Sequence, residues 1–122
     1  MEKIVAYYNT IEPYPDEYVD GSKVKVEAAA DLIGLEVVLD LSKEKGITDY
    51  ESFFEQTARI YSQILPTPEI LLMLLGGDGH PLNYLRTNVN VQMFDELYET
   101  YDVQEGDGLY LPEESRIRFW EE

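Results

Sequence analysis

A chain of 122 residues, of which 44% are hydrophobic and 12% aromatic, has the size and apolar content of one globular domain, so we expect a single domain over residues 1–122. Its 9 basic and 25 acidic residues leave a net charge of −16, which repels phosphate backbones and anionic bilayers and excludes nucleic acid and membrane as expected partners. Without cysteine, the chain has no disulfide, thiolate metal site or cysteine nucleophile. The lack of a signal-like or membrane-spanning apolar run favours a cytoplasmic location.

The longest predicted helix covers Lys23–Lys45. Its apolar residues are spaced by three or four positions, which places them on one face of a helix. These residues are Val26, Ala30, Ile33, Val37 and Leu41. Gly46 follows the helix and is typical of a helix end. The spacing therefore predicts an amphipathic helix with this stripe as its apolar face.

Two further helices are expected in the middle of the chain. Thr48 and Glu51 have the spacing of a capping box, so a second helix begins there, and its apolar stripe continues through Ile64 as far as Pro66. A third helix starts with proline in its first turn, at Thr67-Pro68. Residues 70–75 of this helix are apolar on every side, which predicts that it is buried.

The rest of the chain is predicted to contain a loop at 78–81, one more helix, a turn at 105–108 and a terminal segment. The helix is marked by Val91, Phe94, Leu97, Tyr98 and Tyr101. Residues 116–120 alternate in polarity, which indicates a short strand or an extended segment. The expected fold class is therefore mainly α, a small single-domain helical bundle with at most one short terminal strand.

Two groups of side chains have the composition of a chemical site. Glu27 and Asp31 are four residues apart, so their carboxylates lie one turn apart on one helical face. They form either a solvated helix edge or a metal ligand with a carboxylate that orients a neighbouring ligand. His80, the one histidine, lies in a glycine-rich loop six residues before Arg86. No nucleophile elbow and no phosphate-binding loop is present, so serine-hydrolase and P-loop chemistry are excluded.

Several landmarks follow one another along the chain. They are Val19-Asp20-Gly21, the run 26–35 with its E-x-x-x-D spacing, Phe53-Phe54 with Ala58 and Tyr61, His80-Pro81 with Arg86, Phe94, and the segments 105–110 and 116–120. In this order they resemble the C-terminal segment of the neprilysin family of zinc endopeptidases, the bacterial oligopeptidase O group included. The resemblance covers nearly the whole chain and implies the C-terminal part of a thermolysin-like (gluzincin) catalytic domain.

The resemblance also implies a role for each candidate site residue. Glu27 matches the third zinc ligand, and Asp31 matches the carboxylate that orients a ligand histidine. His80 matches the residue that stabilises the tetrahedral oxyanion, and Arg86 the residue that binds the backbone carbonyl of the substrate. Trp120 matches a closing aromatic residue with a structural role.

The part of the family site that carries H-E-x-x-H is missing from this sequence. Since that motif supplies two zinc ligands and the general base, the chain alone is expected to be inactive. We expect zinc only where another chain completes the site. The candidate partners are an H-E-x-x-H-bearing polypeptide, a second copy of the chain, and an oligopeptide as substrate. The alternative is a non-catalytic acidic module that binds a basic protein or imitates nucleic acid.

Overall fold

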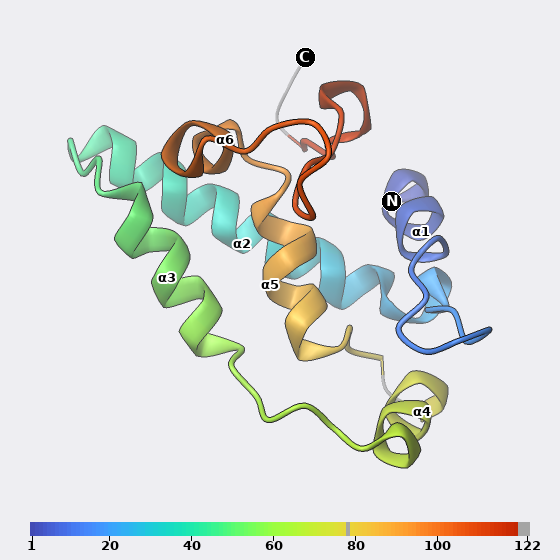
Figure 1. The fold of residues 1–122 in the computed structure, drawn as a ribbon. Coiled ribbons are helices and arrows are strands. Elements are labelled where there is room, and N and C mark those ends of the chain that lie inside the picture. The colour runs from blue at the N-terminus through green and yellow to red at the C-terminus, as the bar shows by residue number, and fades with distance from the viewer. Residues whose placement is uncertain (78, 120–122) are drawn as a thin grey trace.

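The computed structural model describes residues 1–77 and 79–119, and this described part contains six α-helices, one 3-10 helix and no strand (Figure 1). The helices are α1 (Glu2–Tyr8), α2 (Gly21–Glu44), α3 (Tyr50–Ile60), α4 (Pro68–Gly77), α5 (Asn83–Val91), α6 (Asp95–Tyr101) and the 3-10 helix Glu113–Ser115. The prediction of a mainly α bundle is confirmed. The terminal segment is extended at Arg116, and Trp120 lies outside the described residues.

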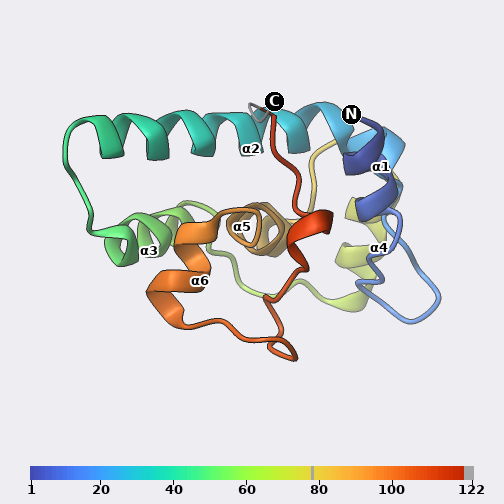
Figure 2. The ribbon, with the colours of Figure 1, turned by 90° about the horizontal axis from the view of Figure 1, so that it is seen from above.

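Helix α2 packs against α1 and α5, and α3 packs against α5 and α6. The Asp20 side chain accepts a hydrogen bond from the backbone N–H of Ser22 and caps the first turn of α2. Figure 2 shows α3, α5 and α6 gathered on one side of α2. The residues that α2 buries on that side include Val24, Ala28, Leu32 and Leu39. The predicted helix Lys23–Lys45 is therefore confirmed.

The predicted apolar face of α2 is not the buried face. We call the stripe Val26, Ala30, Ile33, Val37 and Leu41 the outer stripe. Val26 is 64% exposed and Val37 is 52% exposed, because successive residues are about 100° apart around the helix and the outer stripe lies opposite the buried residues. Helix α2 is thus apolar on two sides, a pattern typical of a helix that has neighbours on both.

Helix α3 begins as predicted but ends early. The side chain of Asp49, rather than Thr48, caps it by accepting a hydrogen bond from the backbone N–H of Ser52. The prediction that its stripe continues to Pro66 is wrong, because the helix ends at Ile60 and Ile64 is 92% exposed. Pro66 disfavours the helical conformation at Leu65, and the chain from Ser62 to Thr67 contains no helix before α4 begins at Pro68.

Helix α4 lies at one end of the molecule (Figure 1), and the prediction that it is buried is wrong. None of its described residues is buried, and Met73 is 66% exposed. Leu71, Leu74 and Leu75 on one side are half-buried. A helix that is apolar all round needs partners on every side, and the described residues supply them on one side only. No helix of the described chain is both long and apolar enough to span a membrane.

Two helices replace the single helix predicted around residues 91–101. Helix α5 ends at Val91. The extended backbone of Phe94 separates α5 from α6. Helices α1 and α5 are not predicted by the sequence analysis. Ile4 and Tyr8 are the buried residues of α1 and are four positions apart, so the helical signal is present but limited to two turns.

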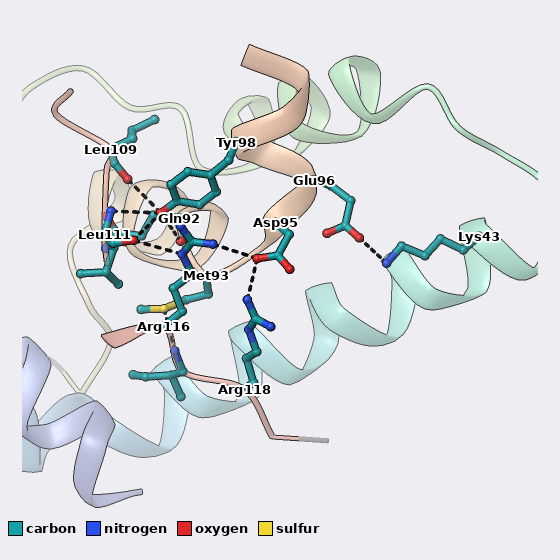
Figure 3. A network of polar contacts seen from close by, with 11 residues as sticks. Lys43, Gln92, Met93, Asp95, Glu96, Tyr98, Leu109, Leu111, Arg116 and Arg118 are labelled. Atoms are coloured by element: carbon teal, nitrogen blue, oxygen red, sulfur yellow. Dashed lines mark hydrogen bonds and ion pairs between the residues drawn. The ribbon is translucent and has the colours of Figure 1, made fainter. Parts of the chain in front are cut away.

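Contacts of Tyr98 and Arg116 hold the segment that follows α6 against the bundle (Figure 3). The Tyr98 hydroxyl lies 2.8 Å from the carbonyl oxygen of Gln92, to which it donates, and accepts the backbone N–H of Leu111 at 3.0 Å. The guanidinium carbon of Arg116 lies 3.6 Å from the centroid of the Tyr98 ring, and its Nη1 donates to Asp95 at 2.8 Å. This network fixes the C-terminal segment on α6.

A second set of contacts joins the same region to α2. Lys43 of α2 forms an ion pair with Glu96 of α6, and the Ile117 N–H donates to the Met93 sulfur at 3.1 Å. Ile117 and Met93 are both buried. The C-terminal part of the chain is therefore held on the same side of α2 as α5, which leaves the outer stripe uncovered by these elements.

Candidate active site

The four predicted site residues come from three segments and form two neighbouring pairs. Glu27 and Asp31 lie in the first turns of α2, His80 lies in the loop before α5, and Arg86 lies within α5. Glu27 pairs with His80, and Asp31 pairs with Arg86. The fold thus brings together all four side chains, although more than 50 residues separate the members of each pair.

The pair of Glu27 and His80 is open to solvent. Glu27 Oε2 lies 3.6 Å from His80 Nε2, and the side chains are 43% and 52% exposed. This separation is longer than a hydrogen bond. The Glu27 carboxylate is therefore accessible to a further ligand.

The pair of Asp31 and Arg86 is largely buried and bidentate. Arg86 Nε lies 2.6 Å from Asp31 Oδ2, and Arg86 Nη2 lies 2.7 Å from Oδ1. The two side chains are only 10% and 19% exposed. Hydrogen bonding to Asp31 raises the pKa of Arg86 above its ordinary value, so the guanidinium keeps its charge and its planar fork stays matched to the carboxylate.

The helices set these positions. On α2, Glu27 and Asp31 lie on the flank between the buried side and the outer stripe, because each residue turns the helix by about 100°. On α5, the Asn90 side chain donates to the backbone oxygen of Arg86 at 2.7 Å. Leu85 and Val89 are buried, which anchors the helix that carries Arg86.

His80 and Arg86 line one open hollow of about 340 Å³, together with Gln63 and Asn83. Imidazole, guanidinium and amide groups all donate hydrogen bonds, so this hollow offers donors to a carbonyl or an oxyanion. A neighbouring hollow of about 290 Å³ between α3, α4 and α5 is mainly apolar. Together they offer hydrogen-bond donors beside an apolar surface.

Two tyrosines at the site were given no role by the sequence analysis. The ring of Tyr61 lies under Arg86, and its hydroxyl lies 3.4 Å from Asp31. The hydroxyl of Tyr8 is the one buried side-chain polar atom of the described residues without a hydrogen-bond partner. Burial, followed by the Asp31 charge, raises the pKa of Tyr8. Tyr8 and Tyr61 are both far along the chain from Asp31 and from Arg86. Spacing along the sequence therefore gives no signal for either tyrosine.

The donor set fits a contribution to a metal site but not a complete one. Residues 1–77 and 79–119 contain no group of three or more His, Cys, Asp or Glu side chains that could hold a metal ion. Zinc in enzymes takes three protein ligands of the histidine and carboxylate type. Glu27 has the right chemistry and exposure for one of them, so the other ligands would have to come from outside these residues.

Comparisons with known proteins place the chain in a family. The profile described as peptidase family M13 matches residues 1–117. The neutral endopeptidase of Lactococcus lactis subsp. lactis (strain IL1403) is 30% identical over 120 residues, which cover 98% of this chain and 19% of that protein. The neutral endopeptidase of Lactobacillus helveticus is 33% identical over 107 residues, which cover 88% of this chain and 16% of that protein. No solved structure matches significantly.

The chain therefore spans about a fifth of the length of the curated relatives described above. The family match extends over both pairs of site residues and over every described helix. The resemblance to the C-terminal segment of the neprilysin family is confirmed, and with it the relation to metalloendopeptidases. On this evidence the chain is a member of peptidase family M13.

Proposed function

We propose that this chain is the C-terminal portion of a zinc endopeptidase that cleaves oligopeptides, and that it works only with a polypeptide that carries H-E-x-x-H. Glu27 would serve as the third zinc ligand and Asp31 would orient a ligand histidine of that polypeptide. The observation that carries the proposal is the convergence of Glu27, Asp31, His80 and Arg86 from three segments of the chain. The cytoplasmic location belongs to the same proposal.

The chain's own residues would bind and orient the peptide. Bound zinc would supply a Lewis acid and an activated water. Arg86 is held by Asp31 through Nε and Nη2, which leaves Nη1 to donate to a substrate carbonyl. His80 lines the same hollow, where it would donate to the oxygen that gains negative charge. Because the sequence lacks H-E-x-x-H, the general base would come from the partner.

The outer stripe supports the idea of a partner. Its exposed large residues are Val26, Val37 and Leu41, on the side of α2 next to Glu27 and Asp31, and contiguous exposed apolar surface usually marks an interface. The relatives are about five times longer than this chain, so they contain further polypeptide that could cover such a surface. A partner docked there would lie beside both carboxylates.

Titration with zinc at neutral pH tests whether the site is incomplete. We expect calorimetry of the purified chain to detect no tight zinc site, with no change in Glu27→Ala or His80→Ala, since one carboxylate cannot hold the ion alone. After mixing with the part of the lactococcal neutral endopeptidase that this chain does not cover, we expect zinc-dependent cleavage of an oligopeptide that Glu27→Ala abolishes. A folded mixture that shows no association would sink the proposal.

Substitution within the outer stripe tests where the partner binds. Val37→Asp should change the free energy of unfolding of the chain by no more than about 0.5 kcal/mol, because exposed positions contribute little. The same variant should abolish association and cleavage, since it buries a charge in the interface. Tyr14→Asp, at a 39% exposed tyrosine in the loop between α1 and α2, is the control outside the outer stripe and should retain both. Equal loss in the two variants would argue against this docking face.

A further inference from the structure

Tyr61, at the C-terminal end of α3, contacts both members of the Asp31–Arg86 pair. The centroid of its ring lies 4.6 Å from the guanidinium carbon of Arg86. Its hydroxyl lies 3.4 Å from Asp31 Oδ1, to which it donates. Side chains from α2, α3 and α5 thus meet at a single guanidinium group.

These contacts restrict the guanidinium in two different ways. Asp31 binds one edge through Nε and Nη2, which fixes the direction of the group within its plane. The guanidinium carbon lies over the Tyr61 ring, which obstructs movement of the group toward that ring. With one edge bound by Asp31 and the ring beside the group, the Nη1 donors are restricted in orientation. Arg86 borders the same hollow as His80, so that orientation decides what a peptide in the hollow can bind.

We propose that Tyr61 is a positioning residue that holds the guanidinium plane of Arg86 in the orientation that receives the substrate carbonyl. The identity of the substrate in this inference rests on the proposed function. The positioning of Arg86 by Tyr61 rests only on the geometry of the free chain. Tyr61 acts through Arg86 and need not touch the peptide.

The ring, more than the hydroxyl, carries this role. A hydrogen bond of 3.4 Å is long for O–H···O and therefore weak, whereas a cation over an aromatic ring within about 6 Å is a favourable contact, strengthened when water is excluded. Burial, followed by the Asp31 charge, raises the pKa of Tyr61, so the phenol stays protonated at neutral pH and adds no second negative charge. Tyr61→Phe should therefore preserve the function that Tyr61→Leu loses.

The positioning can be measured in the free chain by NMR of the arginine Nε–H groups. In Tyr61→Leu, we expect hydrogen exchange at Arg86 Nε to rise about tenfold, in line with the loss of a partly desolvated cation–π contact. Tyr61→Phe should restore the slow exchange. Arg116, which stacks on Tyr98, is an internal reference that should not change in either variant.

Tyr84→Leu is the matched control. Tyr84 is a 42% exposed tyrosine two positions before Arg86, on the other side of α5 because two residues are about 200° apart. Its loss should leave Arg86 unchanged. Unaltered exchange at Arg86 in Tyr61→Leu, or equal acceleration in Tyr61→Leu and Tyr84→Leu, would overturn the proposal. Equal acceleration in Tyr61→Leu and Tyr61→Phe would overturn the assignment to the ring.

Kinetics of the complemented enzyme give the functional readout. Because Arg86 would bind the substrate carbonyl in the ground state and in the transition state alike, Tyr61→Leu should raise KM about tenfold with little change in kcat. Tyr61→Phe should restore KM. A fall in kcat alone would contradict a role in substrate positioning. If no complementation occurs, the proposed function fails, while the NMR result still decides whether Tyr61 positions Arg86.

Discussion

Asp31→Ala should destabilise the folded chain by about 3 kcal/mol, near the lower end of the range for breaking a buried ion pair. The carboxylate is 10% exposed and its partner Arg86 is 19% exposed, so removal of Asp31 leaves a charge largely shielded from water. Exposed pairs contribute at most about 1 kcal/mol. Urea denaturation followed by circular dichroism measures the difference.

A double-mutant cycle measures the interaction energy between Asp31 and Arg86 separately from the other contacts of each residue. Arg86→Met removes the charge that Asp31→Ala leaves unpaired, so the double variant should be more stable than the sum of the two single changes predicts. Asp40→Ala, at an exposed carboxylate on the same helix, is the control and should change stability by less than about 0.5 kcal/mol. A cost below about 1 kcal/mol for Asp31→Ala would mean that the pair behaves as a solvated one.

Gly21→Ala is expected to cost about 3 kcal/mol, because the added methyl group has no room to enter. A Cβ atom at Gly21 would lie 2.4 Å from the backbone oxygen of Val5 and 2.9 Å from its Cα. These are main-chain atoms of α1, so no side-chain rotation relieves the clash and α1 must move away from α2. The Gly21 N–H also donates to Asn9 at 2.8 Å, a contact that the same movement would break.

Gly34→Ala provides the comparison within the same helix. A Cβ atom there meets nothing within 4 Å, and alanine is favoured over glycine in a helix interior by about 1 kcal/mol. We therefore expect Gly34→Ala to raise the urea midpoint and Gly21→Ala to lower it. Similar shifts of the same sign would show that helix propensity, and not the crossing of α1 with α2, controls both positions.

The elements that were predicted correctly are those whose signals are local. Helix α2 follows from a long apolar repeat, and the start of α3 follows from the Thr48–Glu51 spacing, although Asp49 is the residue that caps the helix. Periodicity reports where apolar residues lie on a helix but not which side meets a neighbour. For that reason the sequence predicted α2 but selected the exposed stripe, and it predicted α4 but placed it in the interior.

The helices that escaped prediction are short. Leu82, Leu85 and Val89 are spaced by three and four residues, which is a helical signal for α5. From the sequence, the helix of this region is instead expected to begin near Val91. In the structure Asn90 is 2% exposed and its side chain donates to the Arg86 carbonyl, so the buried amide of a residue type associated with loops finds its partner within the helix.

The sequence predicts the candidate site as a set of residues but not as a set of contacts. The spacing of Glu27 and Asp31 places both on one face of a helix, His80 and Arg86 form a second candidate group, and the family resemblance gives each residue its expected role. Which carboxylate meets which cation depends on how α2 and α5 cross. The contacts of Tyr61 with Asp31 and Arg86 span 30 and 25 positions, beyond the reach of any local pattern.

The two-sided character of α2 has a consequence for how such chains evolve. In the chain by itself, replacing Val26 or Val37 with a polar residue loses little, since both are more than half exposed. Random drift would therefore turn the outer stripe polar over many generations in a lineage without a partner. Where the stripe stays apolar among orthologues while other exposed positions vary, selection has maintained it through a neighbour that covers it, whether a further segment of a longer chain or a second polypeptide. Genome comparison can thus test for such a neighbour before any protein is purified.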